Sequence, residues 1–312
     1  MDRNTGFGIG FAVLVVLSTL ATAPVTTATG TGADETGQNW TVTPAVETSQ
    51  QRTMPGDSWR VTNDVTVNDV ANVTLYWGGL PVMSDDEREV GDMVGIADGC
   101  LLNMGTVSES GEATMLTAGR AANEAGVPLV VDPVGVGATP TRDRVADRLV
   151  TDLDVDVLNG NYGEISALAG DDAEVRGVES VGEYAEIAAA AVECARKTGA
   201  VVVASGETDI VATEEAAFEV DAGHSMMGAV VGTGCMLGAT LAVFAAAIDD
   251  PLAAALTGTA AYGVAGELAA EGAFGDYRGP ASYKTAFLDA VAGLAEASTP
   301  DIADRIDRIE VR

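Results

Sequence analysis

The run Val231-Gly232-Thr233-Gly234-Cys235 is the part of the sequence best suited to chemistry, because two glycines and a thiol precede a long apolar stretch. Glycines let the backbone turn tightly and approach a ligand, and a helix that starts here offers unpaired N–H groups and a positive dipole end. Such a start predicts an anion site suited to a transferring phosphoryl group. A thiol at this position should have a lowered pKa, so Cys235 is a candidate to accept the proton of an attacking hydroxyl. An ordinary glycine-rich turn with a buried cysteine is the alternative.

Other glycine-rich phosphate motifs are missing or weak. No G-x-x-x-x-G-K-[ST] sequence occurs, so the chain has no Walker A loop. The stretch Gly135-Val136-Gly137 lacks the third glycine of a Rossmann fingerprint in register. The start of the helix near residue 234 therefore stays the sharpest candidate for an anion site.

Polar residues follow several short apolar runs. In an open parallel sheet, ligands bind beyond the carboxyl ends of the strands, so we expect these residues to meet at one edge. For Asp132 a second interpretation is open, since the following Pro133 favours an extended backbone and the aspartate could simply end a strand. The strand-end sequences are Asn103-Met104-Gly105-Thr106, Asp132 to Ala138, Asn159-Gly160-Asn161 and Ser205-Gly206.

The elements that must position these residues alternate along the chain. Near-continuous apolar strands between longer helical patterns predict an α/β fold with a mostly parallel sheet that helices cover on both faces. Two further short runs, 209–213 and 217–221, predict an antiparallel edge. The other predicted strands are 100–102, 127–131, 155–158 and 200–204, and the predicted helices are 109–125, 141–152, 181–197, 234–248, 251–270 and 280–296.

Composition excludes several classes of protein. The 47 acidic residues against 16 basic ones give a net charge of −31, which disfavours a nucleic-acid partner. Because the acidic residues are scattered, they indicate a surface adapted to high salt, as in a halophile, rather than a specific cation site. Three cysteines without a C-x-x-C pair, together with a single histidine, disfavour a disulfide framework and a tetrahedral zinc site.

The N-terminus is unusual for such a domain. Residues 5–33 carry no charge, and the apolar segment 7–25 has the outline of a signal peptide, though it is marginal for a membrane-spanning helix. A Thr/Gly-rich linker follows. Export, a membrane anchor and an extension outside the working protein are the three explanations. We favour the last, which predicts a cytoplasmic domain over residues 61–312, an atypical extension over 1–60, and membrane contact only if segment 7–25 is genuine.

A set of motifs in a fixed order covers residues 61–295. Together they resemble the hydroxyethylthiazole kinases, a family of the ribokinase-like superfamily, and their order makes the resemblance more specific than any single motif. The motifs are Thr62 to Asn68 with Ala71-Asn72, Gly79 to Met83, Asn103 to Thr106, Asp132 to Ala138, Gly160-Asn161 with Glu164-Ile165, Gly206 with Asp209, Gly232 to Cys235, and Gly279-Pro280 with Phe287-Leu288-Asp289.

The resemblance implies a fold and a reaction. The fold is a three-layer α/β/α sandwich with a mostly parallel central sheet. The reaction is the ATP- and magnesium-dependent phosphorylation of the primary alcohol of 4-methyl-5-(2-hydroxyethyl)thiazole, a step of thiamine biosynthesis. The family also implies a homotrimer with active sites at the subunit interfaces.

The resemblance further implies roles for individual residues. Cys235 would lie beside the substrate hydroxyl as the candidate base, where many ribokinase-like relatives have an aspartate. The thiazole would contact Gly232 and Met83, together with Asn63 and Val65. The remaining roles are the nucleotide site with its anion hole, implied for Asn159, Ser205, Thr233 and Gly234, and the Mg²⁺ site, implied for Asp132 and Glu164.

Two positions depart from the family pattern. Asn159 stands where the family has an arginine that binds ATP phosphate, and Arg142 is a candidate to replace that charge. The segment before Thr62 reads Gly56-Asp57-Ser58-Trp59-Arg60 instead of ending in Pro-Leu-Val-His. These departures keep two alternatives open: a kinase of the hydroxymethylpyrimidine type, and a degenerate thiazole-binding protein. The asparagine-rich opening and Cys235 argue against the first, whereas Asn159 and the apolar N-terminus support the second.

Overall fold

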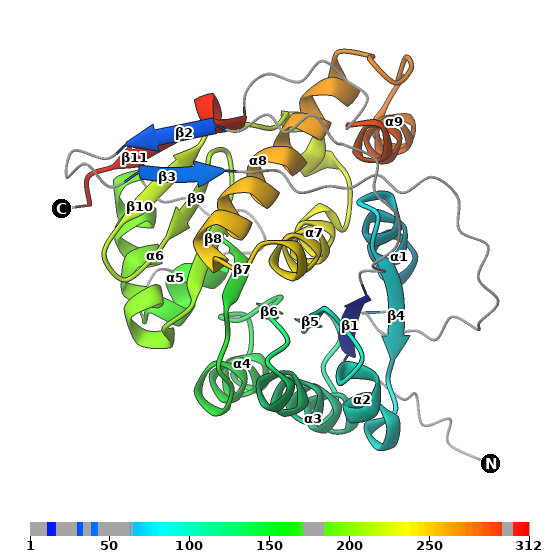
Figure 1. Ribbon diagram of the computed structural model, residues 1–312, viewed down its shortest axis with the longest axis vertical. Helices are drawn as coiled ribbons and strands as arrows, with labels where there is room; N and C mark the ends of the chain where they lie inside the picture. The colour runs from blue at the N-terminus through cyan, green and yellow to red at the C-terminus, as the bar shows by residue number, and fades with distance from the viewer. Residues whose placement is uncertain are drawn as a thin grey trace.

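The computed structural model describes residues 11–16, 30–33, 39–42, 63, 65–170, 184–294 and 302–311. Most of the predicted extension 1–60, including its boundary at residue 60, lies outside these residues. Within the described part, a central sheet is packed between two layers of helices (Figure 1). The expected α/β fold with a sheet covered on both faces is confirmed.

The central sheet is mixed. Among the described residues it has nine strands in the order β11-β10-β9-β8-β7-β6-β5-β1-β4. Strands β5 to β8 pair in parallel, and the remaining neighbours pair antiparallel. These include the predicted antiparallel pair β9 and β10, beyond which β11 forms the edge of the sheet. The bounds are β1 Phe11–Val16, β4 Leu80–Ser84, β5 Gly99–Asn103, β6 Leu129–Asp132, β7 Val157–Asn161, β8 Val201–Ser205, β9 Asp209–Ala212, β10 Ala217–Val220 and β11 Ile306–Ile309.

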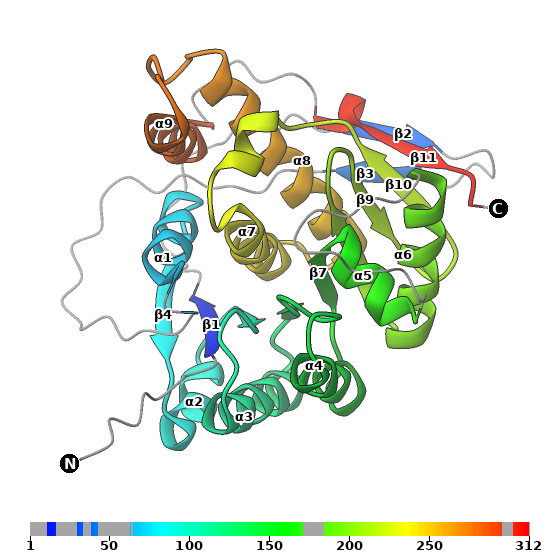
Figure 2. The same ribbon diagram turned by 180° about the vertical axis from the view of Figure 1, so that it is seen from behind.

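Helices cover both faces of this sheet, as two opposite views show (Figures 1 and 2). On one side lie α1 (Val67–Tyr76), α7 (Thr233–Ala247), α8 (Pro251–Ala270) and α9 (Pro280–Gly293). On the other side lie α2 (Glu87–Val94), α3 (Glu109–Ala125), α4 (Pro140–Asp152), α5 (Tyr162–Ala169) and α6 (Tyr184–Thr198). Two short 3-10 helices, η1 (Ser225–Ala229) and η2 (Ile302–Arg305), and a separate strand pair, β2 (Gly30–Ala33) with β3 (Asn39–Val42), complete the described elements.

Strand β1 comes from the apolar N-terminal segment. It lies between β4 and β5 and pairs antiparallel with both, so that Leu14 is opposite Cys100 on one side and Val82 on the other. Its sequence, Phe-Ala-Val-Leu-Val-Val, is apolar and rich in β-branched residues, which suits a strand in the interior of a sheet. Six residues of the segment predicted as an extension therefore join the sheet of the main domain.

Helix α7 passes through the middle of the apolar core. All ten residues from Met236 to Ala245 are buried, and the helix contacts α1, α8 and strands β5 to β7. A helix that is apolar all round is typical of a core position rather than a surface one. Its start is therefore held firmly against the carboxyl ends of the parallel strands.

Among the described residues, no helix is both long and apolar enough to cross a membrane.

Candidate active site

The start of α7 has the backbone that the glycines predict. Gly232 caps the helix with φ of 96°, a left-handed conformation that favours glycine, and a Cβ there would lie 2.6 Å from Cγ2 of Thr66. Tyr262 Oη donates to the carbonyl of Thr233 at 2.8 Å, and Thr233 Oγ1 donates to the carbonyl of Met227 at 3.2 Å. No side chain caps this end within the described residues. The first N–H groups of α7 are therefore available to an anion.

A row of buried polar side chains crosses the strand ends below this helix. We call Asn103, Asp132 and Asn159 the polar row; they are 0%, 3% and 1% exposed. Asn103 of β5 is paired with Asp132 of β6, and Asn159 follows Leu158, the last residue of β7 that is paired with β6. The expectation that the strand-end residues meet at one edge of the sheet is thus confirmed for these three.

Hydrogen bonds connect the polar row to segments distant in sequence. Asn103 Nδ2 donates to Asp132 Oδ2 at 2.6 Å. Asn63 Nδ2 donates to Asn103 Oδ1 at 3.0 Å and approaches Cys235 Sγ at 3.5 Å. Gly105 is required beside this contact, because a Cβ there would lie 2.3 Å from Asn63 Nδ2. The predicted candidates Asn63, Asp132 and Cys235 therefore belong to one network.

The thiol of Cys235 does not have the pKa that its position on the helix predicts. Burial raises the pKa of Cys235 to about 11, and the charge of Asp132 adds to the rise. The nearby polar side chains of Asn103, Thr66 and Asn63 lower this pKa and so act in the opposite direction. The prediction of a lowered thiol pKa is wrong, because desolvation and a nearby negative charge outweigh the helix dipole. The thiol is protonated near neutral pH in this environment.

The two predicted magnesium ligands lie near one another. Burial, and then the charge of Glu164, raise the pKa of Asp132 well above its usual value. Burial also raises the pKa of Glu164, against hydrogen bonds that its carboxylate accepts from the N–H groups of Gly135 at 2.6 Å and Asn161 at 2.8 Å. No group of three or more His, Cys, Asp or Glu side chains suited to a metal occurs in the described ranges. Two carboxylates nevertheless fit Mg²⁺, which usually takes its other ligands from water and substrate phosphates.

Arg142 has no free guanidinium with which to replace the family arginine at the phosphate site. Its Nη1 donates to the carbonyls of Met104, at 2.7 Å, and Val134, and its Nη2 donates to that of Gly105 at 3.1 Å. These carbonyls belong to the loops that follow β5 and β6. Arg142 therefore holds two strand-end loops together beside the polar row.

A hollow of about 650 Å³ opens on the other side of the α7 start. Its volume lies within the range of small-molecule sites. Among its lining residues, Ser205 Oγ donates to the carbonyl of Gly160 at 3.3 Å, and Gly206 N donates to Asp209 Oδ1 at 3.0 Å. Burial raises the pKa of Asp209 to about 7. Its walls include Ser205, Asp209, Thr233, Gly234, Leu237 and Tyr262.

Comparisons with known proteins show which family the chain resembles. The chain matches the Hydroxyethylthiazole kinase family over residues 58–297. Two similar proteins are hydroxyethylthiazole kinases of halophilic archaea. That of Natronomonas pharaonis is 69% identical over 251 residues, which are 80% of this chain and 89% of that protein. That of Haloquadratum walsbyi is 63% identical over 251 residues, which are 80% of this chain and 87% of that protein.

The chain belongs to the hydroxyethylthiazole kinase family. A solved structure of a hydroxyethylthiazole kinase protein from Pyrococcus horikoshii has the same fold, with a TM-score of 0.69 and 34% identity over 80% of this chain and 91% of that one. The predicted family is therefore confirmed, and this structure supports the predicted α/β fold. The family match begins at residue 58, so strand β1 lies outside it.

Two other candidates, Val65 and Met83, differ in how they relate to the network. Val65 is bound through its backbone N–H to Asn63 Oδ1 at 3.1 Å, and its side chain is exposed. Met83 is buried on β4, which β1 separates from β5. The single histidine, His224, has a structural role: its Nδ1 accepts from the N–H of Met226 at 3.2 Å and caps η1.

Two residues at the site were not among the candidates. Thr66 is 3% exposed beside Cys235 and Gly232, and Tyr262 binds the first turn of α7 from α8. Thr66 lies in the asparagine-rich motif, whose polarity was a usable signal. Tyr262 sits in an apolar helix, and its partner is 29 residues away, so no local pattern indicates its role.

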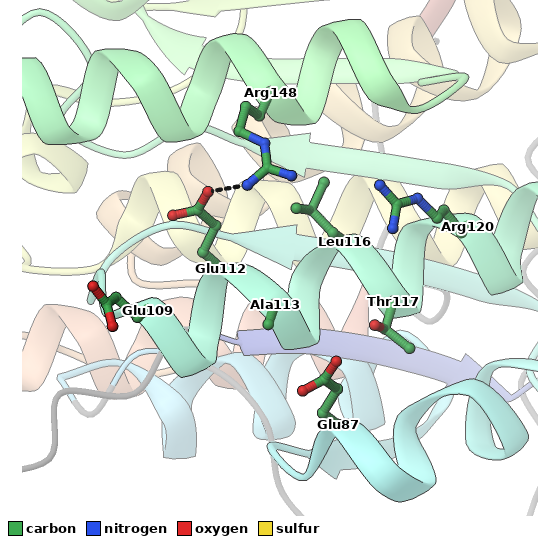
Figure 3. A pocket seen from close by; sticks show the side chains of 8 residues that line it. All are labelled: Glu87, Glu109, Glu112, Ala113, Leu116, Thr117, Arg120 and Arg148. Atoms are coloured by element: carbon green, nitrogen blue, oxygen red, sulfur yellow. Dashed lines mark hydrogen bonds and ion pairs between the residues drawn. The ribbon is translucent and has the colours of Figure 1, made fainter.

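A second hollow, of about 320 Å³, lies on the opposite side of the sheet between α2, α3 and α4. Glu112 at its centre binds Arg148, as Figure 3 shows, with Oε1 2.5 Å from Arg148 Nη1. Arg144 binds both carboxylate oxygens of Glu112, at 2.8 and 2.9 Å. This hollow shares no lining residue with the one beside α7.

Proposed function

We propose that this chain transfers the γ-phosphoryl group of ATP to the hydroxyl of 4-methyl-5-(2-hydroxyethyl)thiazole. The observation that carries the proposal is the uncapped, glycine-rich start of α7 directly above a buried network of Asn63, Asp132 and Cys235. The membership of the chain in the hydroxyethylthiazole kinase family supports the choice of substrate. An anion hole beside a thiol and a carboxylate suits attack by an alcohol on a phosphoryl group.

The chain contributes mainly position and charge to this reaction. The N–H groups at Thr233 to Cys235 would stabilise the negative charge on the transferring group. The substrate oxygen bonds to phosphorus while the bond to the leaving oxygen of ADP breaks, and the hydroxyl proton passes to the Cys235–Asp132 pair. Cys235 would hold the hydroxyl in line, since positioning provides most of the catalysis in phosphoryl transfer.

Magnesium and nucleotide have separate places in the proposal. Asp132 and Glu164 would hold Mg²⁺ directly or through water, and the ion would supply charge for the phosphate oxygens. The hollow beside α7 would take the nucleotide, because Ser205, Thr233 and Gly234 line it next to the anion hole. Gly232, Asn63, Val65 and Met83 stay the proposed thiazole contacts.

We propose a homotrimer with sites between subunits. Val65 and Val231 flank the site and are 72% and 76% exposed, although both are apolar. A neighbouring subunit that covers them would remove this surface from water and close the site. Light scattering in molar KCl measures the oligomeric state, and a monomer with full activity contradicts this part.

Because the reaction uses ATP, we place the working protein in the cytoplasm.

The direct test uses the full chain with ATP, Mg²⁺ and the hydroxyethylthiazole in molar KCl. Mass spectrometry should find the thiazole phosphate together with an equal amount of ADP. A folded protein that binds the thiazole but forms no product would contradict the proposal and favour a degenerate binding protein. Product from a hydroxymethylpyrimidine alone would favour the other ribokinase-like alternative.

A further inference from the structure

Asn159 at the end of β7 has one satisfied and one unsatisfied side-chain atom. Its Nδ2 donates to the carbonyl of Gly234 at 3.2 Å. Its Oδ1 is buried and has no hydrogen-bond partner within the described residues, although the residue is only 1% exposed. Buried polar atoms are nearly always paired, so an orphaned acceptor at a binding site indicates a group that arrives with a ligand.

The orientation of this amide follows from its neighbour. A carbonyl such as that of Gly234 can only accept, so the NH₂ side of Asn159 must face it. Turning the amide over would place two acceptors against each other. The oxygen therefore faces away from Gly234, and no other assignment of the two atoms relieves it.

The surroundings of Asn159 are rich in oxygen. A Cβ on Gly238 would lie 3.3 Å from Asn159 Nδ2 and 3.4 Å from Asp132 Oδ2, so the two side chains are neighbours below α7. Glu164 lies over Gly160, the residue after Asn159, and its charge acts on Asp132. Because Arg142 is bound to backbone carbonyls, no basic side chain is seen to bond with these oxygens in the described ranges. Two carboxylates therefore lie near Asn159, and carboxylate and carbonyl oxygens are the groups that a hard cation or its bound waters prefer.

We infer that Asn159 Oδ1 accepts a hydrogen bond from a water molecule on the Mg²⁺ that accompanies ATP, which makes Asn159 a metal-positioning residue. The inference rests on the proposed function, because it takes magnesium and nucleotide as the ligands. Its claim concerns one oxygen of this chain. The amide oxygen of Asn159 would bind the hydrated Mg²⁺, whereas an arginine at this position would bind the phosphate of ATP directly.

The test compares metal binding with nucleotide binding in the full chain. Mn²⁺ is titrated in the presence of the non-hydrolysable analogue AMP-PNP, and free Mn²⁺ is followed by its EPR signal. Asn159→Leu, which removes the oxygen at similar volume, should weaken Mn²⁺ binding about tenfold or more, as loss of an outer ligand contact does. The affinity for AMP-PNP in EDTA, where no metal is bound, should change by less than about twofold. A variant with a merely structural defect would lose this affinity as well.

Two further variants keep the test decisive. Asn123→Leu is the matched control, because Asn123 makes two hydrogen bonds with the backbone of Asp154 away from the site; it should leave Mn²⁺ binding unchanged. Asn159→Asp keeps an oxygen in place and should bind Mn²⁺ at least as tightly as wild type, even where the leucine variant fails to fold.

The outcomes separate the inference from the proposed function. The inference is overturned if Asn159→Leu weakens the affinity for AMP-PNP equally with and without metal. It is also overturned if Asn159→Asp binds Mn²⁺ weakly. A wild-type chain that binds no Mn²⁺ with AMP-PNP overturns it as well. Oxygen-dependent Mn²⁺ binding in a chain that does not phosphorylate the thiazole upholds the inference and refutes the choice of substrate.

Discussion

The polar row and the cluster around Glu112 each contain a buried carboxylate, but only Glu112 is bonded to basic side chains among the described residues. Glu112 is 7% exposed and binds Arg144 and Arg148. Asp132 is 3% exposed and receives hydrogen bonds from an amide and a thiol, with no arginine or lysine bonded to it in the described residues. The hydrogen bond from Arg144 is the main cause that lowers the pKa of Glu112, whereas burial raises that of Asp132.

This difference separates a structural carboxylate from one that awaits a ligand. The chain itself compensates the charge of Glu112, so that site is complete without any other molecule. The charge of Asp132 is left to groups that the chain does not supply. Burying an uncompensated charge is destabilising, so its presence at the strand ends indicates a function there.

Asp132→Asn should give the largest effect. Removing the carboxylate should lower kcat about a thousandfold, comparable with the loss of one strong electrostatic contact to a reacting group. The free energy of unfolding should stay equal or rise, because a destabilising buried charge disappears. Steady-state kinetics and denaturant unfolding measure the two quantities. Activity within about tenfold of wild type would remove Asp132 from the catalytic network.

Cys235→Ala should give a smaller loss, of about tenfold to a hundredfold in kcat, because the anion hole remains. Cys235→Asp should retain activity, since a carboxylate can take the same proton. Cys194→Ala is the matched control, as Cys194 is buried in α6 away from the site. A folded but inactive Cys235→Asp variant would count against proton acceptance at this position.

Glu112→Gln should affect stability alone. Loss of the charge leaves two arginines without their main partner and should lower the free energy of unfolding by about 1.5 kcal/mol, less in high salt. Glu109→Gln, at the exposed start of the same helix, should change it very little. Urea unfolding at two salt concentrations checks both. A loss of activity in Glu112→Gln would break the contrast between the two regions.

Asp209 gives the smallest expected effect, a dependence of stability on pH. Its pKa is raised from 3.8 to about 7 by burial, so folding takes up a proton between these values. The contribution of this group to the free energy of unfolding therefore falls as pH rises from about 4 to about 7. Asp209→Asn should flatten that part of the melting-temperature profile. An unchanged difference between wild type and variant across this range would contradict the raised pKa.

The sequence predicted the long elements well, because their signals are local. Helices expected at 109–125 and 251–270 are found as α3 and α8, with the same bounds. Helix α5 was missed because it is short and follows strand β7 directly, with no loop between them. The capping box of Asn161 and Glu164 that starts it was a readable signal. Strand β1 lies in a segment that was predicted as an extension, because a leader and an inner strand of a sheet have similar composition, and its pairing with β4 and β5 cannot be read from composition.

At the site, residue types were predictable and their electrostatics were not. The motifs identified Asn63, Asp132 and Cys235, which the structure brings together. The pKa of Cys235 depends on its burial and on Asp132, 103 positions earlier in the chain, and neither can be read from neighbouring residues. The orphaned oxygen of Asn159 likewise exists only once α7 lies over β7.

Helix α7 has a consequence for the rate at which parts of the molecule open. Its ten consecutive buried residues, Met236 to Ala245, cannot leave the core without separating α1, α8 and the sheet. We expect their amide protons to exchange with deuterated solvent only through global unfolding, while the uncapped N–H groups at Thr233 and Gly234 exchange directly. One helix then contains the slowest and some of the fastest exchanging amide protons of the domain. A ligand bound at its start should slow exchange at Thr233 and Gly234, and the exchange rate of the buried residues of the same helix gives the reference.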